Sequence, residues 1–232
     1  MKLLAIDTSS IACSVALQAG DTVLERHEEQ PREHTRLLMP MINAVLADAS
    51  LRVSDLDAIV LGNGPGSFIG MRIAAAVAQG LAHGAGIGIV PVSSLAAVAA
   101  EVFATGPAGA VAVAQDAHMN EVYLGIFERR DDGLPSPLTD ECLHSQTPIE
   151  ALEECAAASR VAAGFGWERY PALLAANRPW IDQVSPVRHP RARHLLPMAA
   201  AAARQGGVIA PRDVAPAYLR HKVAETPSRP TT

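Results

Sequence analysis

Two segments carry residue types that could bind a phosphate group. Residues 62–70 read GNGPGSFIG, and a glycine loop that opens a helix presents free backbone N–H groups to an anion. Asp7 and Thr8 belong to a second segment, Asp7-Thr8-Ser9-Ser10, which could hold a magnesium–phosphate group or hydrogen-bond its own turn. The candidate nucleotide or anion contacts are therefore Asp7, Thr8, Gly64, Gly66 and Ser67.

The glycine loop fits neither of the common nucleotide-binding motifs. A phosphate-binding loop of the Walker type requires Gly-Lys-Ser/Thr after the glycines, which is absent here. The dinucleotide fingerprint that starts at Gly62 and Gly64 requires a third glycine where the chain has Ser67. A purely structural loop, in which glycines permit positive φ and close backbone packing, remains the alternative.

The chain shows no recognisable metal or nucleophile motif. His189 and His194 are five residues apart, which does not match the spacing of a helical zinc pair, and Pro31 interrupts the HExxH pattern that could follow His27. No GxSxG nucleophile elbow occurs. We therefore predict no catalytic residue and no metal. The basic residues between 188 and 194 could contact phosphate, but we expect a solvated loop.

The elements that must position these residues follow from hydrophobic periodicity. Apolar runs predict antiparallel strands at 3–6, 13–17 and 22–27, a helix at 35–49, and a buried strand at 58–61 that leads into the glycine loop. Helices are expected from the loop to about residue 81 and from Ser93 or Ser94 to 103. Another helix is predicted to start after Thr147, which would be its N-cap. Proline follows at the first helical position, and glutamate lies three residues after the cap.

A chain break at Thr105-Gly106-Pro107 predicts two subdomains. New antiparallel strands are expected after it, at 110–115 and 122–127. We assign residues 1–107, together with about 194–225, to the first subdomain and residues 108–193 to a smaller second one. The two halves resemble each other loosely, because each begins with antiparallel strands.

Two of the predicted helices are apolar on more than one side. The first carries Leu38, Met41, Ile42 and Val45 at helical spacing. The second has a stripe of small residues, Gly70, Ala74, Ala78 and Ala82, and the apolar Val77 on another side. Such helices either cover the protein's own sheet or are shared with a partner.

Composition and charge restrict the function classes. The chain has 232 residues, 49% of them hydrophobic, a net charge of −5 and a pI of about 5.9, which argues against an independent nucleic-acid binder. Its three cysteines form no metal or redox spacing, as expected in a reducing compartment. The first apolar run ends at Asp7, too early for a signal peptide, so we expect a cytoplasmic protein without a membrane segment.

Several motifs, in their order along the chain, resemble the TsaB family, formerly called YeaZ. They extend almost from end to end and read LLAIDTSS, ACSVAL, PREHTRLLMPMI, GNGPGSFIGMRIA, AQGLA, VSSL, DAHMNEVY and VAPAYLR. The sequence departs from the family loop at two positions, where Asn63 replaces an arginine and Ile69 a threonine.

The resemblance implies an α/β protein of the actin-like ATPase (ASKHA) superfold, built from two βββαβα-type subdomains. It implies a non-catalytic partner subunit of TsaD, the enzyme that transfers threonylcarbamoyl to adenosine 37 of tRNA. The histidine metal ligands of TsaD are missing here. TsaE would join the assembly, the lone chain would form a homodimer, tRNA would be contacted only indirectly, and a nucleotide could bind only at the joint with TsaD.

The resemblance also implies that the N-terminal helices form the contact surface. We therefore expect Leu38, Met41, Ile42, Val45, Gly70, Ala74, Val77 and Ala78 to contact TsaD or a second copy in a four-helix bundle. Two rival functions are a nucleotide-hydrolysing actin-like enzyme and an M22-type glycoprotease homologue. The first would show ATP turnover by the isolated chain, and the second requires a metal or a nucleophile.

Overall fold

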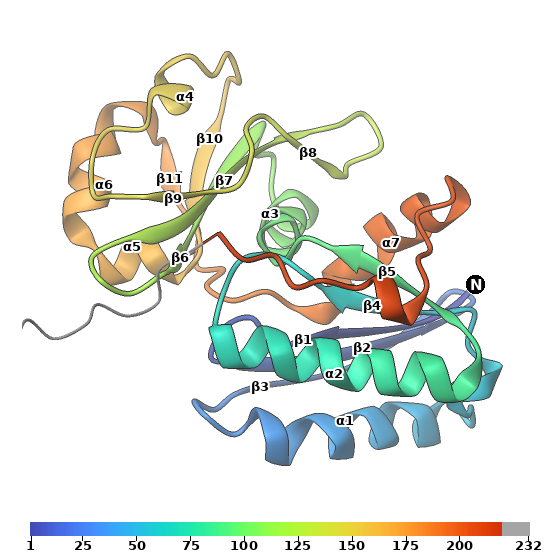
Figure 1. Ribbon diagram of the computed structural model, residues 1–232. Helices are drawn as coiled ribbons and strands as arrows, with labels where there is room; N and C mark the ends of the chain where they lie inside the picture. The colour runs from blue at the N-terminus through green and yellow to red at the C-terminus, as the bar shows by residue number, and fades with distance from the viewer. Residues whose placement is uncertain (220–232) are drawn as a thin grey trace, which may run out of the picture.

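The computed structural model describes residues 1–219, which form two β-sheets and the helices that cover them (Figure 1). The first sheet has the strand order β3-β2-β1-β4-β5. Its strands are β1 (Lys2–Asp7), β2 (Ala12–Ala19), β3 (Thr22–Glu29), β4 (Ala58–Gly62) and β5 (Gly88–Val92). The first three are antiparallel, as predicted, while β4 and β5 run parallel to β1.

The second sheet repeats this arrangement. Its order is β11-β10-β6-β7-β8, with β9 also paired to β7. Its strands are β6 (Ala110–Asp116), β7 (Val122–Arg129), β8 (Pro135–Pro137), β9 (Cys142–His144), β10 (Arg160–Ala163) and β11 (Gln183–Val184). Strands β6 to β8 are antiparallel, and β10 and β11 run parallel to β6. Both sheets therefore share one topology, which agrees with two βββαβα-type units.

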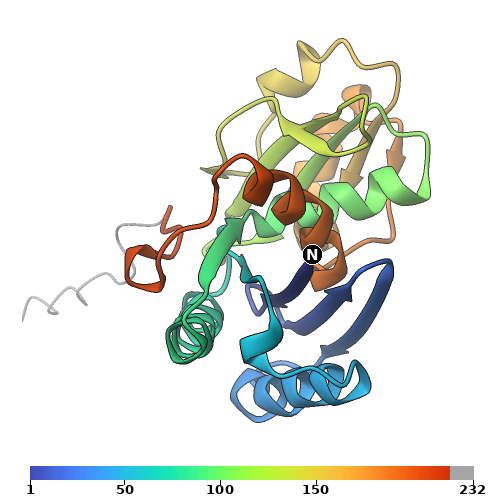
Figure 2. The same cartoon turned by 90° about the vertical axis from the view of Figure 1, so that its right-hand side faces the viewer.

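Helices form layers on the outside of each sheet and between the sheets. Helices α1 (His34–Asp48) and α2 (Phe68–Ala85) cover the side of the first sheet that faces away from the second (Figure 2). Helices α3 (Ser94–Thr105) and α7 (Leu195–Arg204) pack on its other side, and α3 also covers one face of the second sheet. Three short helices lie on the face of the second sheet opposite α3. They are α4 (Glu150–Glu153), α5 (Phe165–Arg169) and α6 (Pro171–Asn177).

Short 3₁₀ turns complete the connections. They are η1 (Val53–Asp55), η2 (Arg178–Trp180), η3 (Ala192–His194) and η4 (Pro211–Asp213). The change from the first sheet to the second falls between β5 and β6, around the predicted break at residues 105–107. Helix α3, which we assigned to the first subdomain, buries Val98, Val102 and Phe103 in the core of the second sheet.

The helix start predicted at Thr147 is wrong. Helix α4 begins only at Glu150, and no side chain caps its N-terminus. The segment before it is held instead by Asn177, which is fully buried. Its Oδ1 accepts a hydrogen bond from Ile149 N at 2.7 Å, and its Nδ2 donates to Thr147 O at 3.0 Å. A tertiary contact has therefore replaced the local cap.

Two glycines of α2 lie in opposite environments and provide a matched test of packing. A methyl group on Gly70 would overlap the Thr8 carbonyl oxygen, whereas one on Gly80 would meet no atom within 4 Å. We expect Gly70→Ala to lower the free energy of unfolding by about 2 kcal/mol or more, because the backbone of the turn after β1 must move. Gly80→Ala should raise it by about 0.5–1 kcal/mol, because alanine favours a helix over glycine.

Urea denaturation of the two variants and the parent chain measures both effects. Equal stability of Gly70→Ala and Gly80→Ala would contradict the close approach of α2 to the turn after β1.

Candidate functional site

The two predicted phosphate-binding segments lie side by side. Strand β1 ends at Asp7 and its parallel neighbour β4 ends at Gly62, so both segments leave the sheet at the same edge. The backbone of the glycine loop presses directly on the turn after β1. Ser67 N donates a hydrogen bond to Ser9 O at 2.6 Å, and a methyl group on Gly66 would overlap that same oxygen. The glycines here serve close backbone packing.

The buried Asp7 carboxylate is fully used by the protein itself. Its Oδ1 accepts hydrogen bonds from Ser9 N at 2.9 Å and from Ser9 Oγ at 2.8 Å. Its Oδ2 accepts one from Ser94 Oγ at 2.6 Å, and that hydroxyl accepts a bond from Gly64 N at 3.2 Å. Asp7 therefore joins the end of β1, the glycine loop and the start of α3.

The remaining candidates for an anion site also have internal partners. Thr8 is fully buried, and its hydroxyl donates to Gly70 O at 2.6 Å. Gly64 and Gly66 are buried, whereas Ser67 is exposed and its hydroxyl caps α2 by accepting from Gly70 N at 3.2 Å. The five predicted contacts come together, but four of them are enclosed by protein. Nucleotide binding at these residues stays a prediction.

The predicted partner-contact residues point mainly into the chain's own core. Leu38, Met41, Ile42 and Val45 of α1 are buried against the first sheet. The small stripe of α2, Gly70, Ala74 and Ala78, is buried in the same core, and Val77 is half-buried beside it. These inward side chains do not form an exposed surface. The correction has a simple reason, since periodicity locates the apolar sides of a helix but does not show which one faces the sheet.

The outward sides of the same helices carry few charges, namely Arg72 on α2 and Arg36 and Asp48 on α1. On α2 the exposed or half-buried positions include Ile69, Ile73, Ala76, Val77, Gly80 and Gly84. Ile69 is 68% exposed, the largest fraction for a big apolar side chain among residues 1–219. On α1, Met39 and Pro40 are exposed. An apolar strip on a helix that already covers a sheet is typical of an interaction surface.

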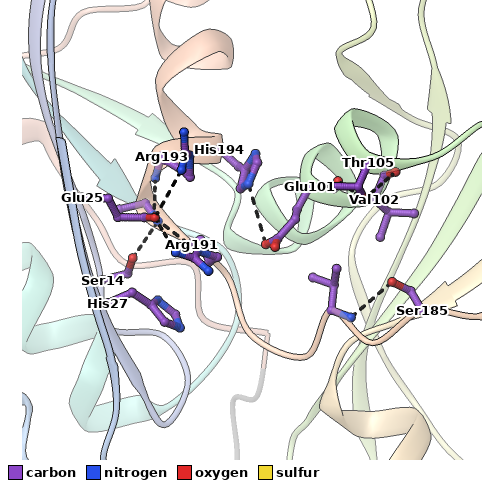
Figure 3. Close-up of polar contacts among 12 residues, drawn as sticks. Ser14, Glu25, His27, Glu101, Val102, Thr105, Ser185, Arg191, Arg193 and His194 are labelled. Carbon is purple, nitrogen blue, oxygen red and sulfur yellow. Dashed lines mark hydrogen bonds and ion pairs between the residues drawn. The ribbon is translucent and has the colours of Figure 1, made fainter. Parts of the chain in front are cut away.

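A cleft of about 700 Å³ between the two sheets was not predicted from the sequence. It is lined by β3, α3, α5, α6 and the segment 184–191 that leads back to the first sheet. Figure 3 shows His27 of β3, Glu101 of α3 and Arg191 of this segment. Its polar lining includes His27, Glu29, Glu101, Arg188, His189 and Arg191. The one sequence signal was the alternation of Glu25, His27 and Glu29, which places these side chains on one face of β3.

Arg188, His189 and Arg191 line this cleft, so the basic stretch 188–194 is not simply the solvated loop that was expected, although Arg193 is exposed. Arg191 forms an ion pair with Glu25 at 2.5 Å, and Arg188 pairs with Glu168 at 2.6 Å. Burial lowers the pKa of His189. Burial, with help from nearby arginines, lowers the pKa of His194 to about 4.

Metal ligands and membrane helices are both missing from the described residues. Within residues 1–219, no three His, Cys, Asp or Glu side chains gather as a set of metal ligands. None of the helices in the described part of the chain has the length and apolar character needed to cross a membrane.

The buried Asp7 generates a test of stability against pH. Burial raises the pKa of Asp7 above its ordinary value of 3.8. The hydrogen bonds from Ser94 and Ser9 lower this pKa, but burial has the larger effect. The folded state therefore binds a proton more tightly than the unfolded state does. Its stability should fall as pH rises from 3.8 to the folded pKa, by about 1.4 kcal/mol for each pH unit in that interval.

Asp7→Asn removes this titration and keeps one acceptor oxygen for Ser9. The free energy of unfolding of the variant minus that of the parent chain should increase as pH rises through that interval. At higher pH this difference should stay constant. Urea unfolding of both proteins across the acid and neutral range measures the difference. Parallel stability curves throughout would contradict a raised pKa for Asp7.

Comparison with known proteins identifies the family. Residues 24–162 match the family model described as TsaD, tRNA N6-adenosine threonylcarbamoyltransferase. The tRNA threonylcarbamoyladenosine biosynthesis protein TsaB of Escherichia coli K12 is 35% identical over 225 residues, covering 97% of this chain and 96% of that protein. TsaB of Haemophilus influenzae is 35% identical over 228 residues, covering 96% and 95%.

Solved structures give the same result. A Pseudomonas aeruginosa protein described as similar to the peptidase YeaZ superposes with a TM-score of 0.84 at 35% identity, covering 94% of this chain and 99% of the other. A structure of YeaZ from the same organism gives a TM-score of 0.84 at 33% identity, with the same coverage. The actin-like α/β fold with two sheets is thus confirmed, and the chain belongs to the TsaB family.

Proposed function

We propose that this chain is a non-catalytic partner subunit in the formation of threonylcarbamoyladenosine in tRNA. The observation that carries the proposal is the near-full-length identity to proteins named for this biosynthesis. The partner would be a TsaD-type transferase, with TsaE joining the assembly and tRNA contacted only indirectly. The lone chain would form a homodimer in the cytoplasm. A nucleotide would bind only at the joint with TsaD.

The enclosed Asp7 cluster supports a role without catalysis. Every polar atom of the Asp7, Thr8 and Ser94 side chains is engaged in hydrogen bonds within the chain. A phosphate group at this edge of the sheet would have to displace these bonds, each worth about 1 kcal/mol or more. The peptidase description of a solved relative belongs to that protein. We keep hydrolysis of nucleotides or peptides as the alternative.

The outward strip of α2, with the exposed part of α1, is the proposed contact surface. It replaces the buried residues predicted from the sequence. A methyl group on Gly80 or Gly84 would meet no atom within 4 Å, so the fold of the single chain does not require glycine at either position. Glycine in a helix costs about 1 kcal/mol relative to alanine, and it allows a second helix to approach closely.

The function is tested by reconstitution. Tagged TsaD from the same cell should copurify with this chain, and tRNA modification in vitro should require it. ATP or peptide hydrolysis by the isolated chain at rates above background would favour the alternative. Modification at full rate without this chain would contradict the proposal.

The contact surface is tested by one substitution placed at two sites. Ala76→Arg puts a long charged side chain on the exposed side of α2. Burying that charge without a partner should weaken the association with TsaD at least about tenfold, while the fold is preserved. Ala156→Arg is the matched control and should bind like the parent chain. Ala156 is exposed in the second of the protein's two lobes, each of which is one sheet with the helices that cover it.

Binding by calorimetry and thermal unfolding should be measured for both variants. Parent-like affinity of Ala76→Arg would show that the strip is not the contact surface. Ala78→Arg cannot serve here, because Ala78 is fully buried and the substitution would disrupt the chain's own core.

A further inference from the structure

The cleft between the two sheets contains polar atoms that the protein does not satisfy. Within residues 1–219, His27 Nδ1, Glu101 Oε2 and His189 Nδ1 are buried and have no hydrogen-bond partner. All three residues line the same cleft. His189 is the most deeply placed, with only 5% of its surface exposed. Buried polar groups normally have partners, so three such atoms around one cavity indicate a ligand that supplies them.

The arginines of the cleft are already neutralised by carboxylates of the chain. Glu25 is largely buried, and it pairs with Arg191 at 2.5 Å and with Arg193 at 3.8 Å. At the opposite wall, Arg188 pairs with Glu168 at 2.6 Å. These guanidinium groups therefore have their counter-charges, and an added anion would have to compete with Glu25 and Glu168 for them.

Two carboxylates of the cleft have only a histidine ring as their ion-pair neighbour among residues 1–219. Glu29 faces His27 Nε2 at 3.4 Å, and Glu101 faces His194 Nε2 at 3.8 Å. The pKa of His194 is about 4, so this ring carries no charge at neutral pH. The cleft and its border thus hold the four carboxylates Glu25, Glu29, Glu101 and Glu168 against the three guanidinium groups Arg188, Arg191 and Arg193. With all four carboxylates ionised the excess is negative. Burial raises the pKa of Glu101 above its ordinary value of 4.5, and a cation bound beside it would favour the ionised form.

One unsatisfied atom, the carboxylate Oε2 of Glu101, indicates a hydrogen-bond donor on the ligand, whereas each imidazole Nδ1 accepts or donates according to its tautomer. A carboxylate oxygen accepts hydrogen bonds, and so does the nitrogen of a neutral imidazole that lacks the proton. If His27 donates from Nε2 to Glu29, its Nδ1 is an acceptor. The opposite part of the cleft is apolar and is formed by Trp167, Leu174 and Val187. The cavity therefore combines acidic acceptors with a hydrocarbon wall.

We propose that this cleft binds a small aliphatic amine in its ammonium form. The ammonium group donates hydrogen bonds to Glu101 Oε2 and to the imidazole nitrogens of His27 and His189, with Glu29 as a second counter-charge. The methylene groups of the ligand lie against Trp167 and Val187. A phosphate-rich ligand is disfavoured, because the excess charge of the cleft is negative.

Two carboxylates on separate walls suit a diamine. Glu101 lies on α3, and Glu29 lies on β3 beside His27, so the two carboxylates border the cleft from different elements. Putrescine, with an ammonium group at each end of four methylenes, is therefore the probe. Its diol counterpart, 1,4-butanediol, has the same length and donates hydrogen bonds but carries no charge.

The test is calorimetric titration of the full chain with putrescine and, separately, with 1,4-butanediol. We expect saturable binding of putrescine and at least about tenfold weaker binding of the diol, because a hydrogen bond to a charged group is stronger than a neutral one. Glu101→Gln should weaken putrescine binding about tenfold, and Glu29→Gln should also weaken it. Glu153→Gln, on the distant helix α4, is the control and should bind like the parent chain.

Thermal unfolding of each variant shows whether it is folded, and Glu29→Gln tests the cleft from a different element should Glu101→Gln fail to fold. No saturable binding at millimolar putrescine would overturn the proposal. Equal affinity for putrescine and the diol, or parent-like affinity of both glutamine variants, would overturn it as well. The proposal is independent of the proposed function, since neither titration involves TsaD or tRNA.

Discussion

The buried carboxylate of Asp7 is the contact on which the first lobe depends. Three elements that are distant in sequence meet at this group, namely the end of β1, the glycine loop after β4 and the start of α3. A buried carboxylate is tolerated only when its oxygens are hydrogen-bonded, and Ser9 and Ser94 provide this. The chain around this group is closely packed, because a methyl group on Gly62 would overlap the Asp7 carboxylate, and methyl groups on Gly66 and Gly70 would overlap the carbonyl oxygens of Ser9 and Thr8. Within the loop that resembles a phosphate site, the N–H groups of Gly64 and Ser67 are bonded to Ser94 Oγ and Ser9 O.

A second set of contacts fixes the two lobes relative to each other. The segment that follows β11 is bound to the second sheet through Val187 O and Arg188 O, which accept hydrogen bonds from Gly164 N at 2.8 Å and Phe165 N at 3.0 Å. A few residues later, Ala192 N donates to Ser14 Oγ at 2.8 Å in the first sheet, and Arg191 pairs with Glu25. The segment thus connects both sheets and forms one wall of the cleft. The cleft's shape depends on this connection.

The proposed contact surface and the core of the first lobe share the same two helices. One side of α2 buries alanines against the sheet, and the other exposes Ile69, Ala76 and Gly80. Small residues on the inner side of α2 bring this helix close to β1 and β4. Such close packing restricts the motion of the whole helix, including its outer side. A rigid helix loses little conformational entropy when a partner binds it, which favours association. The surface therefore depends on the packing beneath it.

Local chemistry in the sequence determined much of the fold. Hydrophobic periodicity located the three N-terminal strands, helices α1 and α2, and the new strands after Thr105-Gly106-Pro107, because these patterns depend only on neighbouring residues. The parallel pairing of β1 with β4, which brings the glycine loop beside Asp7 and Thr8, came from the structure. The family resemblance implied the actin-like fold with two βββαβα-type subdomains, and the order of strands within each sheet came from the structure.

The tertiary structure alone decided which side of each helix is buried and where long-range polar partners meet. Leu38 of α1 and Ala78 of α2 lie inward because the first sheet covers that side of each helix. The opposite side of each helix is also apolar, so the sequence did not show which side would be buried. Asn177 replaces a local cap at Thr147 because a residue 30 positions away reaches it. The cleft that His27, Glu101 and His189 line could not be predicted from the sequence either, because it depends on contacts between residues distant in the chain. Its side chains come from β3, α3 and the segment after β11, and only the folded chain brings these together.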